Sequence, residues 1–334
     1  MILISSKHGF VGNSAALLSL FIENKSSEYE VIWKGNNHGV DNRKITSWQS
    51  TGLIKEAMLL TTTKFAFFSH TPADVALYIP KSVCCVNLWH GNPIKYILKD
   101  NAVENKIKNK TIKILFNQDP TKCDFFISGS SFYNPIMERC TGLSPEKIIN
   151  VGLPRNLFLF DYKNKGKYCL FAPTFNDKYT QETLVEELAN KWCKIFKTQR
   201  IKLHIKLHPN DKTDLSNVQK LPWVVVEDKG QEINGLMVFA SMLITDFSSI
   251  AFDFMILKRP VFLMLQQFNQ CESLRGGTYF SANEVEDIFI CSKSIDQLIE
   301  KIENYDNKCL AVDDERFNSR FDLNVFLNKI KFKK

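Results

Sequence analysis

The stretch Leu243-Ile244-Thr245-Asp246-Phe247-Ser248-Ser249-Ile250-Ala251-Phe252-Asp253-Phe254 runs from a short apolar strand through a polar turn straight into a helix. A helix N-terminus presents unpaired N–H groups and a partial positive charge, and hydroxyl groups add donors, so an anion is well placed there. The alternative is that the serines only cap the helix. No Gly-x-Gly-x-x-Gly occurs, so a simple dinucleotide fingerprint is not supported. We predict that this strand end binds a phosphate and an adjoining sugar through Thr245, Asp246, Ser248, Ser249 and Asp253.

The same order of strand and helix recurs along the chain. In the first half, strand-like runs lie at 29–33, 65–68, 82–89, 125–128 and 148–151, and helical patterns lie at 14–23, 54–60 and 134–140. In the second half, strands are predicted at 168–171, 201–207, 223–226, 242–245 and 261–263, and helices at 181–196, 233–239, 249–257 and 295–305. Strands that alternate with helices predict parallel sheets with right-handed crossovers.

A polar, Gly-containing stretch, Asp161-Tyr162-Lys163-Asn164-Lys165-Gly166-Lys167, separates two apolar runs and is typical of a linker. The 334 residues are enough for two domains that each have their own core. We therefore predict an α/β chain of two doubly wound parallel-sheet lobes, residues 1–162 and 163–334, with a central cleft. Ligands bind in such sheets at the carboxyl ends of the strands.

A histidine ends the apolar strand within Val83-Cys84-Cys85-Val86-Asn87-Leu88-Trp89-His90-Gly91-Asn92-Pro93-Ile94-Lys95. Gly91 and Pro93 then turn the chain. A histidine at a strand's carboxyl end can accept a proton from a hydroxyl group near neutral pH, whereas the alternative is a hydrogen-bonded structural histidine. We predict a catalytic role for His90, and for Lys95 either a phosphate contact or simple solvation.

The segment Ile201-Lys202-Leu203-His204-Ile205-Lys206-Leu207-His208-Pro209 alternates between apolar and polar residues, which places its lysines and histidines on one face. A parallel strand covered on both sides is normally apolar on both, so the polar face needs partners. An edge strand with a solvated face is the alternative, and it suits Lys202 and His204. We predict that His208 is functional and that Lys206 contacts a phosphate.

Two further turns directly follow predicted strands, Gly152-Leu153-Pro154-Arg155-Asn156 and Ala172-Pro173-Thr174-Phe175-Asn176. A guanidinium group suits a phosphate or a carboxylate of the other lobe. The alternative is that both are structural turns. We predict that Arg155 and Thr174 belong to the phosphate-binding group.

Composition indicates an ordered globular protein, because 44% of the residues are hydrophobic, 24% are charged and 26 are Phe. The net charge of +7 suits a phosphate-bearing partner or an anionic membrane surface, and equally a solvated basic surface. Basic residues concentrate at 95–113 and 329–334, and the second segment suits an interfacial anchor or a frayed helix end. No nucleic-acid-binding motif occurs, so no nucleic-acid partner is expected.

The N-terminal residues lack the basic region and the length of a signal peptide, and no run approaches the roughly 18 apolar residues of a spanning helix. Nine scattered cysteines lack the spacing of metal ligands or of a disulfide framework. We expect a cytoplasmic protein that is at most peripheral on the inner face of the cell membrane.

In their order and spacing, these motifs resemble the CDP-glycerol glycerophosphotransferase family, whose members prime or polymerise teichoic acids and related capsule polymers. The resemblance extends from about Asn13 to about residue 325. It rests on His90–Lys95, Gly152–Asn156, Ala172–Phe175, Leu207–Pro209, Ile244–Phe254, Lys258-Arg259-Pro260 and Arg275-Gly276.

The resemblance implies a GT-B fold and the transfer of glycerol phosphate from CDP-glycerol to a hydroxyl group of a lipid-linked or polymeric acceptor, with release of CMP. It implies an acceptor-side first lobe and a donor-binding second lobe. His90 is similar in position to the catalytic base of the family, and Gly91, Asn92 and Lys95 fall on the acceptor side. The donor group would include His208, Ser248, Ser249 and Asp253.

The chain departs from the family pattern at Leu157, where Asp is frequent, and at Asn176, where Arg is common. A Pro-Gly pair is also missing from Glu284-Val285-Glu286-Asp287-Ile288. These departures leave the polyol and the acceptor open, so a CDP-ribitol ribitolphosphotransferase is one alternative.

A GT-B glycosyltransferase or epimerase that uses a UDP-sugar is a second alternative, and a non-catalytic membrane-associated scaffold is a third. No carboxylate cluster has metal spacing, so no cofactor is expected to be required, although Mg²⁺ stays open. The sequence also leaves open whether the protein is a primase or a polymerase, and what its oligomeric state is.

Overall fold

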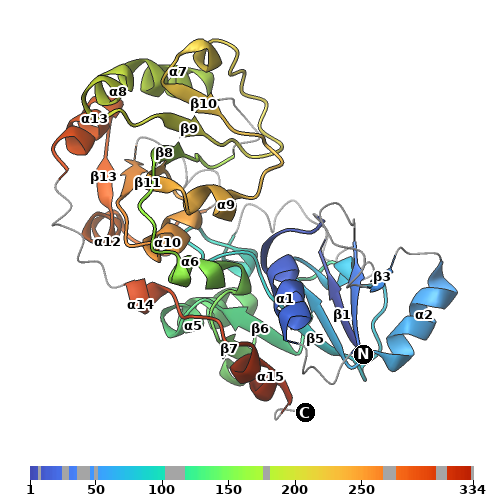
Figure 1. Cartoon of the computed structure of the whole chain (residues 1–334). Helices are drawn as coiled ribbons and strands as arrows, with labels where there is room; N and C mark the ends of the chain where they lie inside the picture. Colours follow the sequence, from blue (N-terminus) through green and yellow to red (C-terminus); the bar gives the residue numbers. More distant parts are fainter. Residues whose placement is uncertain are drawn as a thin grey trace. The chain divides into compact units, whose positions relative to one another are not determined.

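The computed structural model describes residues 1–6, 9–24, 30–35, 46–48, 52–101, 117–175, 181–265, 276–305 and 314–331. The chain divides into two compact units (Figure 1). Unit 1 comprises Met1–Asn92, Ile97–Phe158 and Glu315–Lys334, and unit 2 comprises Pro93–Tyr96 and Leu159–Asp314.

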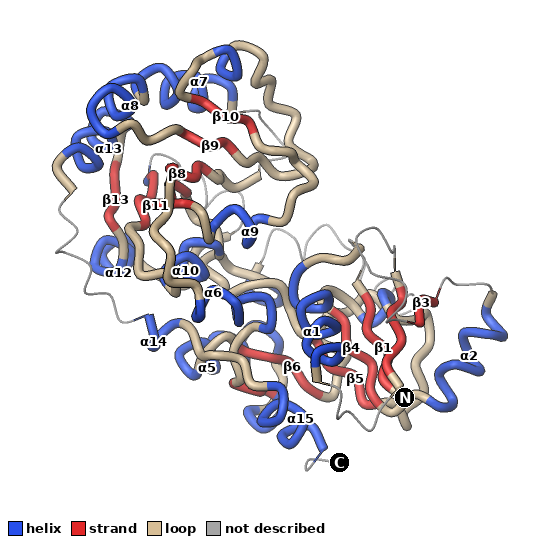
Figure 2. Tube along the Cα trace, viewed as in Figure 1, coloured by secondary structure: helices blue, strands red, loops and turns tan. Residues whose placement is uncertain are grey.

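Unit 1 is built on a parallel sheet of seven strands in the order β3-β2-β1-β4-β5-β6-β7. The strands are β1 (Ile2–Ser5), β2 (Val31–Lys34), β3 (Thr46–Trp48), β4 (Phe65–Phe68), β5 (Cys84–Asn87), β6 (Phe125–Ser128) and β7 (Ile148–Asn150). Among the described residues, the helices are α1 (Gly12–Glu23), α2 (Leu53–Thr62), α5 (Asn134–Thr141), α14 (Asp314–Phe317) and α15 (Leu323–Lys331), and α6 (Leu157–Asp161) begins in unit 1 and ends in unit 2. The strand order reverses between β1 and β4, which lie side by side in Figure 2. A ligand is expected at the carboxyl ends of strands around such a reversal.

Strand β4 shows why the sequence pattern of this sheet is so apolar. Phe65 and Phe67 belong to one buried cluster, whereas Ala66 and Phe68 belong to another. Successive side chains of a strand point to opposite faces, so both faces of β4 are covered. A strand covered on both faces reads as a continuous apolar run, and the prediction of 65–68 therefore coincides with the observed strand.

Unit 2 repeats the plan with six parallel strands in the order β10-β9-β8-β11-β12-β13. The strands are β8 (Tyr168–Phe171), β9 (Leu203–Ile205), β10 (Val224–Val226), β11 (Ala240–Thr245), β12 (Val261–Met264) and β13 (Ile290–Ser292). The helices are α7 (Glu182–Lys191), α8 (Cys193–Gln199), α9 (Ile233–Met237), α10 (Ile250–Met255), α12 (Ala282–Ile288) and α13 (Ile295–Glu303). Here the order reverses between β8 and β11. The predicted pair of doubly wound parallel sheets is confirmed, and the predicted cleft stays a prediction.

The core of unit 2 lies between one face of its sheet and three helices. Leu203 and Ile205 of β9 are fully buried there against apolar residues of α7, α8 and α13. Trp192, which lies between α7 and α8, is fully buried in the same cluster and donates its ring N–H to the carbonyl oxygen of Ile201. This packing fixes β9 and so positions the residues that follow it.

The predicted linker at 161–167 is packed against unit 2. The N–H of Lys167 donates to the carbonyl oxygen of Phe239 at 2.7 Å. A Cβ atom on Gly166 would lie 2.1 Å from the backbone of Ala240, so only glycine fits at this close approach. The division between the units accordingly falls between Phe158 and Leu159 and not at the predicted 162/163.

The C-terminal segment returns to unit 1, whereas the prediction placed it in the second lobe. The ring of Phe326 lies 5.7 Å from that of Phe67, and Phe326 and Ile330 are fully buried. Lys329 donates to the carbonyl oxygen of Asn150 at 2.9 Å. The apolar side of α15 is therefore core. Residues 332–334 lie outside the described residues, so an interfacial anchor at 329–334 stays a prediction. None of the helices in the described part of the chain has the length and apolar character needed to span a bilayer.

Candidate active site

The backbone before His90 is held in an unusual conformation by two buried asparagines. Trp89 has φ of 50°, in the left-handed region that bulky residues rarely adopt. Its N–H donates to Oδ1 of Asn87 at 2.8 Å. Nδ2 of Asn13, from α1, donates to the carbonyl oxygens of Leu88 and Trp89 at 2.9 and 3.0 Å. The chain just beyond β5 is thus fixed from two sides, and the exposed His90 follows it directly.

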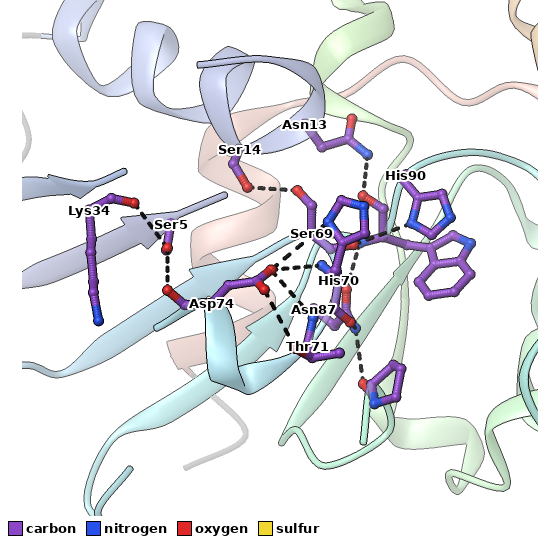
Figure 3. A network of polar contacts seen from close by, with 12 residues as sticks. Ser5, Asn13, Ser14, Lys34, Ser69, His70, Thr71, Asp74, Asn87 and His90 are labelled. Carbon is purple, nitrogen blue, oxygen red and sulfur yellow. Dashed lines mark hydrogen bonds and ion pairs between the residues drawn. The ribbon is translucent and has the colours of Figure 1, made fainter. Parts of the chain in front are cut away.

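The imidazole of His90 is oriented by the loop that follows β4 (Figure 3). Its Nδ1 lies 3.3 Å from the carbonyl oxygen of Ser69. A carbonyl oxygen can only accept, so Nδ1 carries the proton of the neutral ring. Nε2 is then left with its lone pair, which is the form that a general base requires.

The two residues after His90 are buried, and Asn92 has a structural role within unit 1. Its Nδ2 donates to the carbonyl oxygen of Phe317 at 3.3 Å and to Oδ1 of Asn318 at 3.2 Å. A Cβ atom on Gly129 would lie 1.9 Å from Oδ1 of Asn92. This asparagine anchors the returning C-terminal segment, and its predicted acceptor-side role stays a prediction. The predicted acceptor-side role of Gly91 stays a prediction.

Lys95 lies with unit 2, although it was predicted on the acceptor side. It pairs with Thr278 in an antiparallel bridge, and Tyr96 donates its N–H to the carbonyl oxygen of Gly277 at 3.0 Å. Nζ of Lys95 is 3.2 Å from Oγ1 of Thr174. The lysine therefore adds a positive charge to the loop that follows β8.

That loop and the one that follows β11 are joined at the point where the strand order of unit 2 reverses. The backbone N–H of Thr174 donates to Oδ1 and Oδ2 of Asp246 at 3.0 and 3.1 Å, and its hydroxyl group also donates to Oδ1. Oγ1 of Thr245 donates to the carbonyl oxygen of Ala172 at 2.6 Å. Thr174 and Asp246 thus lie at the expected ligand position, and the fully buried Thr245 ties the two loops together.

Ser248 and Ser249 follow in the same turn and are half-buried. Ser249 is the N-cap residue of α10, and its side chain makes no capping hydrogen bond. The alternative in which this serine serves only as a side-chain cap is therefore not what the structure shows. Asp253 is fully buried within α10, and its predicted contact with a sugar stays a prediction.

His208 is held in the tautomer opposite to that of His90. Its ring stacks on Phe175, with the centroids 4.9 Å apart and the planes at 21°. The backbone N–H of Asn210 donates to Nδ1 at 3.1 Å, and a backbone N–H can only donate. The neutral ring therefore carries its proton on Nε2, where it can donate to a ligand.

The remaining polar residues of that segment have structural partners. Strand β9 lies between β10 and β8, so the edge-strand alternative is wrong. His204 stacks on Tyr168 at 3.6 Å and pairs with Glu227 through Nδ1 at 2.5 Å. Lys206 donates to the carbonyl oxygens of Leu207 and Lys229 at 3.0 and 2.8 Å, and burial lowers its pKa. These contacts favour a structural role for Lys206 over the predicted phosphate contact.

Arg155 belongs to unit 1, and its predicted contact with a phosphate stays a prediction. Its backbone N–H donates to Oδ1 of Asn13 at 3.1 Å, so one asparagine holds both this turn and the turn before His90. A Cβ atom on Gly152 would lie 2.1 Å from the carbonyl oxygen of Ser319, and Gly152 has φ of 79°. Glycine is therefore required where the turn meets the returning chain.

Four residues that contact His90 or the backbone before it were not predicted from the sequence, namely Asn13, Asn87, Ser69 and His70. His70 comes two residues after the apolar strand Phe65–Phe68, close to the signal that identified His90, so it could have been found. Arg275, which carried part of the resemblance, and Asn176, which departs from the family pattern, lie outside the described residues. In the described part of the chain, no group of three or more His, Cys, Asp or Glu residues is arranged to hold a metal ion.

Comparison with known proteins adds independent findings. The model of the family described as CDP-Glycerol:Poly(glycerophosphate) glycerophosphotransferase matches residues 1–323. A teichoic acid poly(glycerol phosphate) polymerase of Bacillus spizizenii is 26% identical over 96% of this chain and 86% of that protein. The same enzyme of Staphylococcus epidermidis is 26% identical over 65% of this chain and 33% of that protein, so the match spans about a third of that relative.

A solved structure of the wall teichoic acid polymerase TagF superposes with a TM-score of 0.75. The match covers 100% of this chain and 90% of that chain at 18% identity. At this identity the likeness concerns the fold alone, and it agrees with the predicted GT-B-like pair of lobes.

Proposed function

The chain belongs to the CDP-glycerol:poly(glycerophosphate) glycerophosphotransferase family, and from that premise we propose that it transfers glycerol phosphate from CDP-glycerol to a hydroxyl group of a lipid-linked or polymeric acceptor in teichoic acid synthesis. The observation that carries the proposal is the contact between Nδ1 of His90 and the carbonyl oxygen of Ser69. It leaves Nε2 of an exposed histidine as a proton acceptor, at a site otherwise built from backbone contacts and buried amides.

The proposed reaction is a single displacement. The acceptor oxygen attacks the β-phosphorus of CDP-glycerol, while Nε2 of His90 takes the hydroxyl proton. The bond between that phosphorus and the bridging oxygen breaks, and CMP leaves with the electron pair. General-base assistance of this kind contributes about 10²–10⁴-fold to the rate.

The donor-binding part of the proposal rests on unit 2. Nε2–H of His208 and the hydroxyl groups of Ser248 and Ser249 supply donors, and Lys95 supplies a positive charge beside Thr174. Donors and charges already in place stabilise negative charge as it develops on the leaving phosphate. Lys95 is thus assigned to the donor, in place of the acceptor side.

Two further predictions concern the cofactor and contact with the membrane. The absence of a required cofactor stays a prediction, with Mg²⁺ open. Contact with the membrane through the basic segments at 95–113 and 329–334 also stays a prediction. Within those segments, Lys95 and Lys329 have partners in the protein, and residues 102–116 and 332–334 lie outside the described residues.

The test is a comparison of donors. Purified protein is incubated with an acceptor and with CDP-glycerol, CDP-ribitol or a UDP-sugar, and CMP or UDP release and product size are measured. We expect CMP from CDP-glycerol and an acceptor that grows by glycerol phosphate units. Turnover of the UDP-sugar would favour a glycosyltransferase or epimerase, and the binding of no nucleotide would favour a scaffold; either result contradicts the proposal.

A further inference from the structure

A second histidine lies against the proposed base. The rings of His70 and His90 are stacked, with their centroids 5.0 Å apart and their planes 10° from parallel (Figure 3). His70 is the residue next to Ser69, whose carbonyl oxygen accepts from Nδ1 of His90. One dipeptide after β4 therefore contacts His90 both at its ring edge and at its ring face.

His70 is itself held firmly. Its backbone N–H donates to Oδ2 of Asp74 at 3.3 Å, and its carbonyl oxygen accepts from Nδ2 of Asn87 at 3.3 Å. Its Nδ1 lies 3.9 Å from the same carboxylate oxygen, in an ion pair whenever the ring is protonated. The side chain of Asp74 is almost fully buried in η1 (Pro72–Asp74), where it forms a capping box with Thr71.

Both ends of this loop are fixed as well. Oγ of Ser14, from α1, and Oγ of Ser69 share a hydrogen bond of 2.6 Å. Oγ of Ser5, at the end of β1, donates to the carbonyl oxygen of Asp74 at 2.6 Å. The loop that carries His70 is therefore tied to both neighbouring elements at the point where the strand order reverses.

The indole ring of Trp89 also lies against His90, with the centroids 4.0 Å apart, but it is tilted by 35°. A hydrogen bond at Nδ1 does not by itself fix an imidazole. The ring can still pivot about that contact, which swings the lone pair of Nε2 away from a hydroxyl group. A flat ring stacked on its face removes this freedom. The rate of catalysis depends strongly on the orientation of the reacting groups. A ring stacked on the catalytic histidine can therefore raise the rate without touching the substrate.

We propose that His70 is a positioning residue that acts through His90, holding its imidazole in the plane in which Nε2 meets the acceptor hydroxyl. This inference rests on the proposed function for its kinetic part. The ringless variants H70A and H70N should lower kcat about tenfold and change KM for CDP-glycerol less than about twofold. H70F, which keeps a flat ring, should stay within about threefold of wild type.

Coupling and a matched control separate positioning from general damage. If His70 acts through His90, H70A added to H90A should cause no further loss of kcat. The control is H204F, which alters another stacked histidine, at Tyr168 in unit 2, and should leave kcat unchanged. Thermal unfolding of every variant checks that it is folded, and H70N replaces H70A if H70A is not.

A measurement without substrate separates this inference from the proposed function. Long-range ¹H–¹⁵N correlation spectra of the imidazole nitrogens report the tautomer of His90 in the resting protein. Without a ring at position 70, the pivoting imidazole no longer keeps Nδ1–H in line with the carbonyl oxygen of Ser69. We therefore expect the Nδ1–H form in wild type and H70F, and a mixture of forms in H70A and H70N. An unchanged His90 spectrum in both ringless variants, or a loss of kcat that adds fully to that of H90A, overturns the inference. If wild-type protein were inactive with CDP-glycerol, the proposed function would be overturned. The spectra would then still test whether His70 positions the ring of His90.

Discussion

Nδ1 of His90 points at the carbonyl oxygen of Ser69, 3.3 Å away, so the loop after β4 determines which nitrogen of the histidine after β5 is basic. The two strands are neighbours in the sheet, and Phe68 pairs with Asn87 at their carboxyl ends. The contact is therefore a consequence of parallel pairing, which brings the two strand ends to one edge of unit 1. In unit 2 the corresponding contact of His208 is with a backbone N–H, and it selects the other tautomer.

The tautomer of His208 predicts how its substitutions rank. A glutamine amide can place an N–H near the position of Nε2, whereas alanine cannot. We expect kcat/KM with CDP-glycerol to fall about 10²-fold in H208A and about tenfold in H208Q. Steady-state kinetics with varied donor measure both values. If H208Q were as slow as H208A, Nε2–H donation would not be the role of this residue.

Asn13 should be important for the stability of unit 1. Its buried amide satisfies the backbone of Leu88, Trp89 and Arg155 with three hydrogen bonds. N13A leaves these groups without their partner, so the free energy of unfolding should fall by about 2–4 kcal/mol in urea titrations. The control S19A, on the same helix, should change it by less than about 0.5 kcal/mol. Equal effects of the two substitutions would show that the Asn13 contacts are energetically unimportant.

Thr174 should affect donor binding more than chemistry. Its hydroxyl group links Asp246 to Lys95 at the edge where the sheet order of unit 2 reverses. T174V removes both contacts, and KM for CDP-glycerol should rise about tenfold with kcat reduced less. T174S keeps the hydroxyl group and should behave like wild type. An unchanged KM in T174V would remove this loop from the donor site.

The stability of unit 2 should decrease on acidification because of His204. Burial lowers the pKa of His204 below its ordinary value, against the raising effect of Glu227. The unfolded chain then binds the proton more readily, so the stabilisation is present above the ordinary pKa of about 6.5 and is lost as the pH falls through the lower folded pKa.

H204F keeps the stack on Tyr168 but cannot be protonated. Its urea midpoint should therefore decline less than that of wild type between pH 7.5 and pH 5.5. A decline as steep as in wild type would assign the acid sensitivity to other groups.

The fold was largely predictable because most strands are covered on both faces. The strands β4, β6 and β8 are short continuous apolar runs, and their predicted bounds are the observed ones. The central strand β1 was not predicted, because Ile2–Ser5 is a short run at the start of the chain with no preceding turn. The return of α15 to unit 1 depends on contacts such as Phe326 with Phe67, and no local pattern records a contact between residues so far apart.

The candidate site was predictable in its positions but not in its side-chain directions. Strand ends identify His90, His208, Thr174 and Asp246, because polar residues follow apolar runs there. Whether a lysine reaches a hydroxyl group, as Lys95 does, or a carbonyl oxygen, as Lys206 does, depends on packing that residue spacing does not encode. The orienting amides of Asn13 and Asn87 were missed for the same reason.

The central claim is that Nε2 of His90 removes the proton of the acceptor hydroxyl. The most direct measurement is the rate of CMP release from CDP-glycerol by wild type and H90A, each with saturating acceptor and each confirmed to be folded. We expect H90A to be at least about 100-fold slower, with the affinity for CDP-glycerol retained. Release of CMP by H90A at a rate close to that of wild type would contradict the claim.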